Sequence, residues 1–292
     1  LPENLKDPSA EGSMLLTEKL MAKWHRRGRQ LYAIIPRFAP TSTPLQLKLA
    51  GELYRAHLDQ GVYLHTHLDE AEGEIRWAMS LFPEARDYTD IYDRFGLLGH
   101  HTVLAHCCIV TPREWKRLSE AGCGVAHCPS SNLFLGDGEF KYRQATDPAR
   151  PCRVGIGSDV GAGTSFSIPR QLGDAYKVAM LDDNPLDALR SFYMATLGGA
   201  RVLRLEDTIG SIRPGREADL AVLDLKATEF LEWRLQFAHS LPEKLFVLQT
   251  LAPDNLNRAT YVAGKKVFDR HRPHQLSYPS ELPCGFAFSS KN

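Results

Sequence analysis

The feature of this sequence that most constrains its fold is a fivefold alternation of short apolar segments and amphipathic helical segments. Each apolar segment ends in polar residues. It is followed by a segment in which apolar residues recur with the spacing of one helix face. Continuous apolar segments of this length are typical of strands that are buried on both faces of a parallel sheet. We therefore predict an α/β fold in which helices cover a parallel sheet. The predicted strands are residues 31–36, 61–67, 102–106, 124–128 and 153–158.

The helical segments have recognisable start and stop signals. The segment TPREW has the Thr-to-Glu spacing of a capping box, and a glycine ends the helix that follows it. Another helix is predicted over residues 44–60, where Leu45, Leu49 and Leu53 lie on one stripe. We expect this leucine stripe to face the core.

The number of strand–helix units predicts part of a barrel. A closed (β/α)₈ barrel of the TIM type needs eight units, so the five units seen here would be strands 4–8. After about Leu205 the segments IGSIRPGREADLAVLDL and ATYVAGKKVF predict short strands joined by Gly and Pro turns. We expect residues 1–205 to form the barrel portion. Residues 206–292 would form a C-terminal β segment and tail, as part of a small β domain.

Charge and cysteine content exclude several classes of protein. Lys and Arg total 35 and Asp and Glu total 35, so no positive field favours a phosphate backbone, and we expect no nucleic-acid partner. No segment approaches the roughly 20 apolar residues of a membrane span, and the N-terminal segment has no apolar signal core. Six cysteines are too few for a disulfide scaffold, so we expect reduced thiols and a cytoplasmic protein.

Polar side chains suited to catalysis recur where the predicted strands end. Arg37, His67, His106 and Asp159 lie at or just after strand ends, and Glu70 follows His67 by three residues. Active sites of parallel α/β folds form at this edge of the sheet. A single histidine there is more often bound to a carbonyl group or to water, but the combined pattern is harder to explain in that way. Imidazole and carboxylate groups are the ligands of a catalytic zinc ion.

Six motifs give the chain a resemblance to a known family. In order they are PRFAPTST, THLDEAEGEI, VLAHC, GVAHCPSSNLFL, GIGSDVGAGTSFS and ATLGGARVLRL. Together they resemble the guanine deaminases of the metal-dependent amidohydrolase superfamily, over about residues 1–268. VLAHC, AHCPSSN and GSD alone also fit related deaminases and chlorohydrolases. PRF and the segment SSNLFLGDG favour guanine.

The resemblance implies a metal-dependent hydrolysis of guanine to xanthine and ammonia. His67 from the fifth barrel strand and Asp159 from the eighth would be metal ligands, and Asp159 would also take a proton from the bound water. Glu70 would move a proton to a purine ring nitrogen. His106 would stabilise the attacking water or the tetrahedral centre. The metal would be Zn²⁺, with Fe²⁺ as an alternative because the same N and O ligands serve both.

Substrate contacts are also implied by the resemblance. Arg37 and Phe38 match the family's PRF pair, which contacts the purine through hydrogen bonds and ring packing. We expect His67, Glu70 and His106 to border the substrate as well. A neutral small-molecule purine agrees with the zero net charge of the chain. We expect the protein to assemble as a homodimer.

Two further histidines are predicted not to be ligands. His65, with Thr66 and His67, imitates the His-x-His pair that the family has on its first strand, but the flanking residues match the fifth strand. We interpret His127 as a structural residue at a strand end. The first-strand pair and the purine-binding segment after it are absent from this sequence. We therefore expect this chain alone to bind metal weakly and to have little deaminase activity.

Three alternative functions stay open from the sequence. The chain could belong to another amidohydrolase deaminase that acts on cytosine, an oxidised purine or a triazine, which substrate profiling would distinguish. It could be a catalytically inactive fragment or an interaction domain, which metal content would distinguish. A nucleotide-binding α/β protein is the weakest alternative, because the glycines at 161 and 163 follow an aspartate instead of preceding a helix cap.

Overall fold

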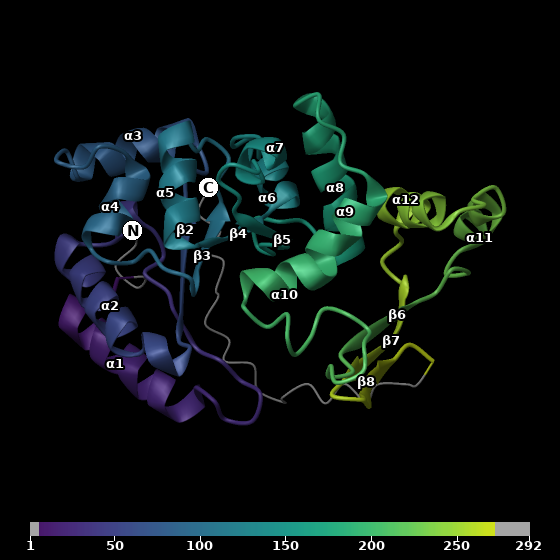
Figure 1. Cartoon of the computed structure of the whole chain (residues 1–292), viewed down its shortest axis with the longest axis horizontal. Coiled ribbons are helices and arrows are strands. Elements are labelled where there is room, and N and C mark those ends of the chain that lie inside the picture. The colour runs from purple at the N-terminus through teal and green to yellow at the C-terminus, as the bar shows by residue number, and fades with distance from the viewer. Residues whose placement is uncertain (1–5, 272–292) are drawn as a thin grey trace, which may run out of the picture.

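The computed structural model describes residues 6–271. Within them, a parallel sheet lies among helices and a smaller antiparallel sheet lies apart from it (Figure 1). Residues 272–292 of the predicted C-terminal tail, including the sixth cysteine, lie outside the described residues. The parallel strands are adjacent in chain order: β1 (Ala33–Ile34), β2 (Tyr63–Leu68), β3 (Thr102–His106), β4 (Gly124–His127) and β5 (Arg153–Ile156).

The parallel sheet confirms the predicted strand–helix units. β3 has the predicted bounds, and each of the other strands differs from its predicted bounds by one or two residues at one or both ends. β2 and β3 pair in a register that places His67 beside Ala105 and Leu68 beside His106. All neighbouring strands run in the same direction. Their carboxyl ends therefore lie along one edge of the sheet.

At least one helix follows each parallel strand. These helices are α1 (Ala10–Trp24), α2 (Pro44–Ala56), α3 (Glu72–Leu81), α4 (Tyr88–Arg94), α5 (Pro112–Ala121), α6 (Pro129–Leu135), α7 (Tyr142–Ala145), α8 (Ile168–Leu181), α9 (Ala188–Tyr193) and α10 (Gly199–Val202), with α1 preceding β1. Short 3₁₀ segments occupy Ala39–Thr41 and Leu58–Gln60, and a π-helical turn, Met194–Gly198, joins α9 to α10.

Local capping chemistry accounts for the helix ends. The Thr111 side chain accepts a hydrogen bond from the Glu114 backbone N–H, while the Glu114 carboxylate accepts one from the backbone N–H of Thr111. Gly122 then ends α5 with a φ of 74°, a left-handed conformation that glycine adopts without steric cost. These are the start and stop signals predicted for this helix.

The buried face of α2 differs from the predicted leucine stripe. Leu47 and Tyr54 are buried, whereas the Leu45 side chain is 44% exposed. The reason is a close approach at Gly51, where a Cβ atom would lie 1.9 Å from the carbonyl oxygen of Phe95. Only a glycine allows α2 to pack this closely against the backbone at Phe95. This backbone contact, and not the size of the leucine side chains, determines which face of the helix points inward. The predicted stripe was therefore wrong at Leu45, whereas Leu53 is half-buried and packs against the core.

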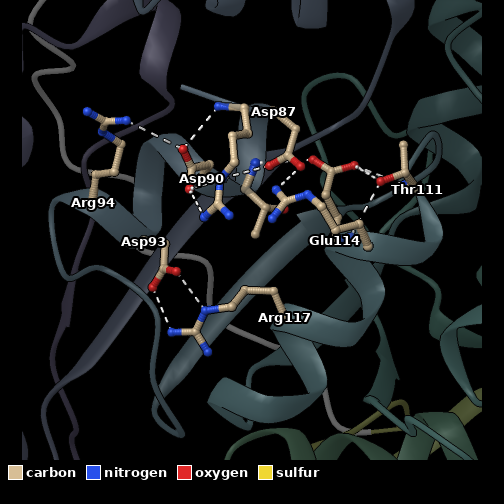
Figure 2. Close-up of polar contacts among 10 residues, drawn as sticks. Asp87, Asp90, Asp93, Arg94, Thr111, Glu114 and Arg117 are labelled. Carbon is tan, nitrogen blue, oxygen red and sulfur yellow. Dashed lines mark hydrogen bonds and ion pairs between the residues drawn. The ribbon is translucent and has the colours of Figure 1, made fainter. Parts of the chain in front are cut away.

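Polar contacts fasten α4 to α5, as Figure 2 shows. Arg117 donates two hydrogen bonds to the Asp93 carboxylate, at 2.6 and 2.7 Å. Glu114 accepts one hydrogen bond from the backbone N–H of Thr89 and another from the Thr111 hydroxyl. A two-pronged arginine–carboxylate pair fixes orientation as well as distance. Helix α4 is thus held in a defined position relative to α5.

The C-terminal part confirms the predicted short strands and adds two helices between them. The antiparallel sheet contains β6 (Leu220–Leu223), β7 (Asn257–Val262) and β8 (Lys265–Asp269). Between β6 and β7 the chain forms α11 (Glu229–Leu235) and α12 (Leu241–Leu251), and α12 packs on α8 and α9. No helix in residues 6–271 is long and apolar enough to cross a bilayer.

Candidate active site

The predicted polar residues lie along one edge of the parallel sheet. His67 is next to last in β2, His106 ends β3, and Asp159 follows β5 by three residues. The backbones of Asp69, His106 and Asp159 have φ angles of 49°, 70° and 44°, in the left-handed region that residues with a Cβ atom rarely adopt. Such strained backbone positions cluster at functional sites. These three strained residues therefore lie at the same edge of the sheet as the predicted polar side chains.

Three side chains form a compact group with metal-binding chemistry. One nitrogen or oxygen atom of each of Glu70, His106 and Asp159 lies within 4.8 Å of the other two. His106 is fully buried, and the two acids are partly exposed. Within the described part of the chain, this is the group of three or more His, Cys, Asp or Glu residues that reaches this spacing. The structure thus places the three residues in one site.

Glu70 and His106 form a pair of neutral groups. Oε1 of Glu70 lies 3.1 Å from Nδ1 of His106. Burial, reinforced by the negative charges of Asp137 and Glu74, raises the pKa of Glu70 to about 8. Burial, reinforced by the neighbouring His67 ring, lowers the pKa of His106 to about 4. At pH 7 the contact is therefore not an ion pair, in spite of its short distance.

Asn132 of α6 fixes the orientation of the His106 ring. Its amide Nδ2 donates a hydrogen bond to His106 Nδ1 at 3.1 Å and lies 3.5 Å from Oε1 of Glu70. Since Nδ1 accepts, the neutral imidazole has its proton on Nε2. That Nε2 atom is buried and has no hydrogen-bond partner among the described residues. The site therefore presents an unpaired N–H group to a bound molecule.

His67 is oriented by the backbone of the PRF motif. Its Nδ1 donates a hydrogen bond to the carbonyl oxygen of Arg37 at 2.8 Å, which leaves Nε2 as the free acceptor. The His67 ring stacks on the His106 ring with a centroid distance of 5.0 Å. It lies beside the group of Glu70, His106 and Asp159 without being a member of it. A backbone carbonyl that holds one imidazole nitrogen is a common support for a metal-binding histidine.

Phe38 and Arg37 border the site on the side of β1. The Phe38 ring lies 5.7 Å from the His67 ring and 6.2 Å from the Trp77 ring, measured between centroids. The Arg37 guanidinium lies 5.3 Å from the Phe38 ring centroid. Arg37 also lines a cavity of about 820 Å³, together with Trp77 and the start of α1. The Phe38 ring thus lies beside His67, and the Arg37 guanidinium lies over that ring.

His65 and His127 are outside the three-residue group. Nδ1 of His65 contacts the carbonyl oxygen of Val103 at 3.0 Å, and burial lowers the pKa of its ring. The His127 ring stacks on Phe140 with centroids 4.5 Å apart, and burial lowers its pKa to about 3. His65 is therefore engaged with the neighbouring strand, and His127 is packed as a neutral ring.

Two residues at the site were not assigned from the sequence. Asn132 belongs to the quoted motif AHCPSSN but received no role. Asp137 belongs to the segment SSNLFLGDG, and its negative charge helps to raise the pKa of Glu70, while the N–H of Gly138 donates to the Glu70 carbonyl at 3.0 Å. The sequence could have indicated them only through their position: both residues closely follow β4, whose carboxyl end lies at the same edge of the sheet. The contacts themselves depend on tertiary structure.

The donor set fits a divalent metal ion. In the neutral His67 ring, the hydrogen bond donated by Nδ1 leaves Nε2 as the possible ligand atom, and Asp159 offers carboxylate oxygens. The buried, unpartnered Nε2 of His106 indicates that this space accommodates a further polar group. Zinc and iron sites use these ligand types. The residues present are therefore compatible with a catalytic metal site.

Comparison with known proteins places this arrangement in a family. Residues 2–267 match the Amidohydrolase family. The chain belongs to this family. Guanine deaminase of Escherichia coli is 44% identical over 270 residues, which cover 92% of this chain and 60% of the relative. A probable guanine deaminase of Deinococcus radiodurans is 35% identical over 86% of this chain and 57% of the relative.

Solved structures of amidohydrolases share the fold. The Escherichia coli guanine deaminase structure superposes with a TM-score of 0.88, covering 92% of this chain and 62% of that chain. A guanine deaminase from C. acetobutylicum with bound guanine is 26% identical with a TM-score of 0.81, covering 92% of this chain and 62% of that chain. The five parallel strands are thus part of an amidohydrolase (β/α)₈ barrel. The chain spans about half to 60% of the length of the curated relatives it matches.

Proposed function

We propose that this chain forms the larger part of a guanine deaminase, which hydrolyses guanine to xanthine and ammonia. The observation that supports this most directly is the convergence of Glu70, His106 and Asp159 next to a loop that offers Arg37 and Phe38. An acid, a hydrogen-bond donor and a metal-binding carboxylate meet beside a surface suited to a planar, hydrogen-bonding ring. The identity to guanine deaminases supports the same substrate.

His67 and Asp159 would hold the metal in this proposal. A zinc ion, when bound, makes a water molecule acidic enough to act as a nucleophile near neutral pH. Zinc is supported by the N and O donor set and by the zinc in a 26% identical adenosine deaminase structure from Xanthomonas campestris, with a TM-score of 0.75. Iron would use the same donors. The Arg37 carbonyl accepts a hydrogen bond from Nδ1 of His67, so Nε2 of the neutral ring would face the metal as its ligand atom.

Proton transfers would then be divided among three side chains. Asp159 would accept a proton at a carboxylate oxygen when water attacks the amine-bearing ring carbon. Glu70, whose pKa of about 8 keeps it protonated at pH 7, would donate a proton to a ring nitrogen. The Nε2–H group of His106 would donate a hydrogen bond to the oxygen of the tetrahedral centre. Transfer of a further proton to the amine lets ammonia leave.

Substrate binding would use the loop after β1. The Phe38 ring, which lies next to the His67 ring, would pack on the purine face, and the Arg37 guanidinium would donate hydrogen bonds to purine acceptors. His67, Glu70 and His106 would border the ring on the metal side. Guanine is uncharged, so this site needs no strong surrounding field.

A substrate panel tests the proposal. The chain, alone and joined to the segment of the Escherichia coli relative that it does not cover, would be assayed with zinc on guanine, cytosine, an oxidised purine and a triazine. We expect the joined protein to hydrolyse guanine at least about tenfold faster than the other compounds. Preference for another compound would reassign the substrate. Metal-loaded protein without any turnover would contradict the enzyme proposal.

We also propose an organisation and a setting for the protein. The barrel portion would end near residue 205, and the following residues would belong to a small β domain, supported by the antiparallel sheet of β6, β7 and β8. A homodimer is supported by exposed aromatic side chains on α11 and in its next turn, Phe230, Trp233 and Phe237. A reducing compartment such as the cytoplasm is supported by the free, buried thiols of the described cysteines. Sedimentation of the purified chain would test the dimer.

A further inference from the structure

We propose that Tyr92 is a positioning residue that couples the purine-binding loop to the metal-binding strand. The proposal rests on the function proposed above, because it takes Arg37 and Phe38 as substrate contacts and His67 as a metal ligand. Tyr92 itself lies behind the site on α4 and is fully buried. It would act through the backbone of both segments and would not touch the substrate.

The Tyr92 hydroxyl bridges the two segments directly. It donates a hydrogen bond to the carbonyl oxygen of His67 at 2.8 Å. It accepts a hydrogen bond from the backbone N–H of Ala39, which directly follows the PRF motif, at 3.0 Å. The Ala39 N–H lacks access to water because Ala39 is fully buried, and the contact with the His67 carbonyl is partly buried. One hydroxyl therefore satisfies a donor on the loop and an acceptor on the strand.

A second set of contacts converges on the carbonyl oxygen of Arg37. This oxygen accepts hydrogen bonds from His67 Nδ1 at 2.8 Å, from the Thr66 hydroxyl at 2.9 Å and from the His67 backbone N–H at 3.3 Å. The Thr66 hydroxyl also lies 3.2 Å from the Tyr92 hydroxyl. A shift of the loop that moves the Arg37 carbonyl would therefore disturb the orientation of the His67 ring. Tyr92 restrains that shift from the other side of the loop.

Helix α4 is a firm support for this bridge. Asp93, which follows Tyr92, is held by two hydrogen bonds from Arg117 of α5, and Asp90 accepts two from the Arg86 side chain (Figure 2). The Tyr92 ring also packs on the Tyr88 ring with centroids 5.4 Å apart. The hydroxyl is thus presented from a helix whose own position is fixed. Positioning groups act best when such packing limits their movement.

Replacing Tyr92 by phenylalanine removes the bridge and keeps the ring. The buried Ala39 N–H and His67 carbonyl would then lose a partner, and such unsatisfied groups favour local rearrangement. We expect the loop to move relative to β2. The KM for guanine should rise by about tenfold, because the loop offers the substrate contacts, while kcat should change less. Amide hydrogen exchange should accelerate at Ala39 and also at His67.

The exchange at His67 separates coupling from a local effect. The His67 amide donates to the Arg37 carbonyl and has no contact with the Tyr92 hydroxyl through its N–H. Faster exchange there requires that the loop has moved away from the strand. The matched control is Tyr54→Phe, because Tyr54 is equally buried on α2 and its hydroxyl contacts Thr102 at 3.3 Å, away from the loop. We expect Tyr54→Phe to lower the melting temperature by a similar amount and to change neither amide exchange at His67 nor KM.

Each outcome decides between coupling and plain stability. Accelerated exchange at both Ala39 and His67 in Tyr92→Phe, without such a change in Tyr54→Phe, supports the proposal. Equal loss of melting temperature in both variants, with unchanged exchange at His67, would overturn it and leave Tyr92 as a core residue. The exchange experiment needs neither metal nor turnover. Absence of guanine hydrolysis in the unsubstituted joined protein would thus refute the proposed function, while the exchange data would still decide the role of Tyr92.

Discussion

The backbone carbonyl of Arg37 accepts a hydrogen bond from Nδ1 of His67 at 2.8 Å, so the residue whose guanidinium lines a cavity also orients the imidazole that we propose as a metal ligand. The two roles belong to different atoms of Arg37. A side-chain substitution keeps the carbonyl group and removes only the guanidinium. Substrate binding and metal binding can therefore be separated experimentally at this one position.

Arg37→Ala should raise the KM for guanine by about tenfold or more, because purine acceptors lose a charged donor. Metal content should stay unchanged, since the carbonyl that orients His67 is retained. Steady-state kinetics and elemental analysis of the same preparation measure both. Arg201→Ala is a suitable control, because Arg201 also lies over an aromatic ring, that of Tyr193, on α10. Unchanged kinetics with a lowered melting temperature would instead assign Arg37 to loop stability.

Glu70→Gln should reduce turnover by two or more orders of magnitude and leave metal content nearly intact. A general acid typically contributes about 10² to 10⁴ to the rate, and glutamine has the same shape without the transferable proton. Turnover and bound metal should be measured together. Glu72→Gln is the matched control, because Glu72 is two residues away with its side chain 73% exposed. Full activity of Glu70→Gln would remove Glu70 from the mechanism, and lost metal would make it a ligand.

His67→Ala should abolish zinc binding, whereas His65→Ala should leave it within a few-fold of the original affinity. The two histidines lie on the same strand, but Nδ1 of His65 contacts the Val103 carbonyl, while the His67 ring stacks on His106. Competition with a chromophoric chelator measures the affinity without any assay of turnover. A loss of zinc binding in His65→Ala comparable to that in His67→Ala would show that His65 is a ligand after all.

The parts of this fold that follow from local chemistry could be predicted from the sequence. β3 and the Thr111 capping box depend on residues that are close together in the chain, and both were found as expected. The predicted inward face of α2 was wrong at Leu45, because this face depends on the contact between Gly51 and the Phe95 carbonyl, 44 residues apart. Helical spacing shows that a stripe exists but cannot show which neighbour it meets.

The candidate site shows the same division. The strand-end position of His67, His106 and Asp159 follows from the alternation of strands and helices, so the sequence could predict their edge of the sheet. The contact of Asn132 with His106 and the bridge made by Tyr92 join segments that are 25 to 53 residues apart in the chain. No local pattern encodes those distances. Supporting residues are therefore visible only once the elements have packed.

Asp90→Asn should lower the free energy of unfolding by about 1 kcal/mol or less, because it breaks the pair with the Arg86 side chain. The Arg86 hydrogen bond lowers the pKa of Asp90 below its usual value of 3.8. A lowered folded-state pKa contributes stability above pH 3.8, and this contribution is lost as the pH falls through the folded-state pKa. The difference between Asp90→Asn and the original protein should therefore shrink below about pH 4.

Chemical unfolding at pH 7 and at pH 3.5 measures this difference. Asp207→Asn is the control, because the Asp207 side chain is 95% exposed and its pair with Arg216 should contribute little. A stability difference for Asp90→Asn that is the same at both pH values would contradict the assignment to the Arg86 contact.

Asn132→Ala should lower kcat for guanine by about tenfold and leave its KM nearly unchanged. The amide of Asn132 donates a hydrogen bond to Nδ1 of His106 and thereby keeps the ring proton on Nε2. In the proposed mechanism this Nε2–H group donates to the oxygen of the tetrahedral centre, so it is needed in the chemical step and not in substrate binding. Its removal frees the ring to rotate or to change tautomer, so the loss should fall on the chemical step. Nitrogen NMR of the His106 ring would show the altered tautomer directly. The control Asn255→Ala removes an exposed amide that contacts only the Ala227 carbonyl and should change neither quantity. An unchanged His106 spectrum in Asn132→Ala would contradict the idea that this amide sets the tautomer.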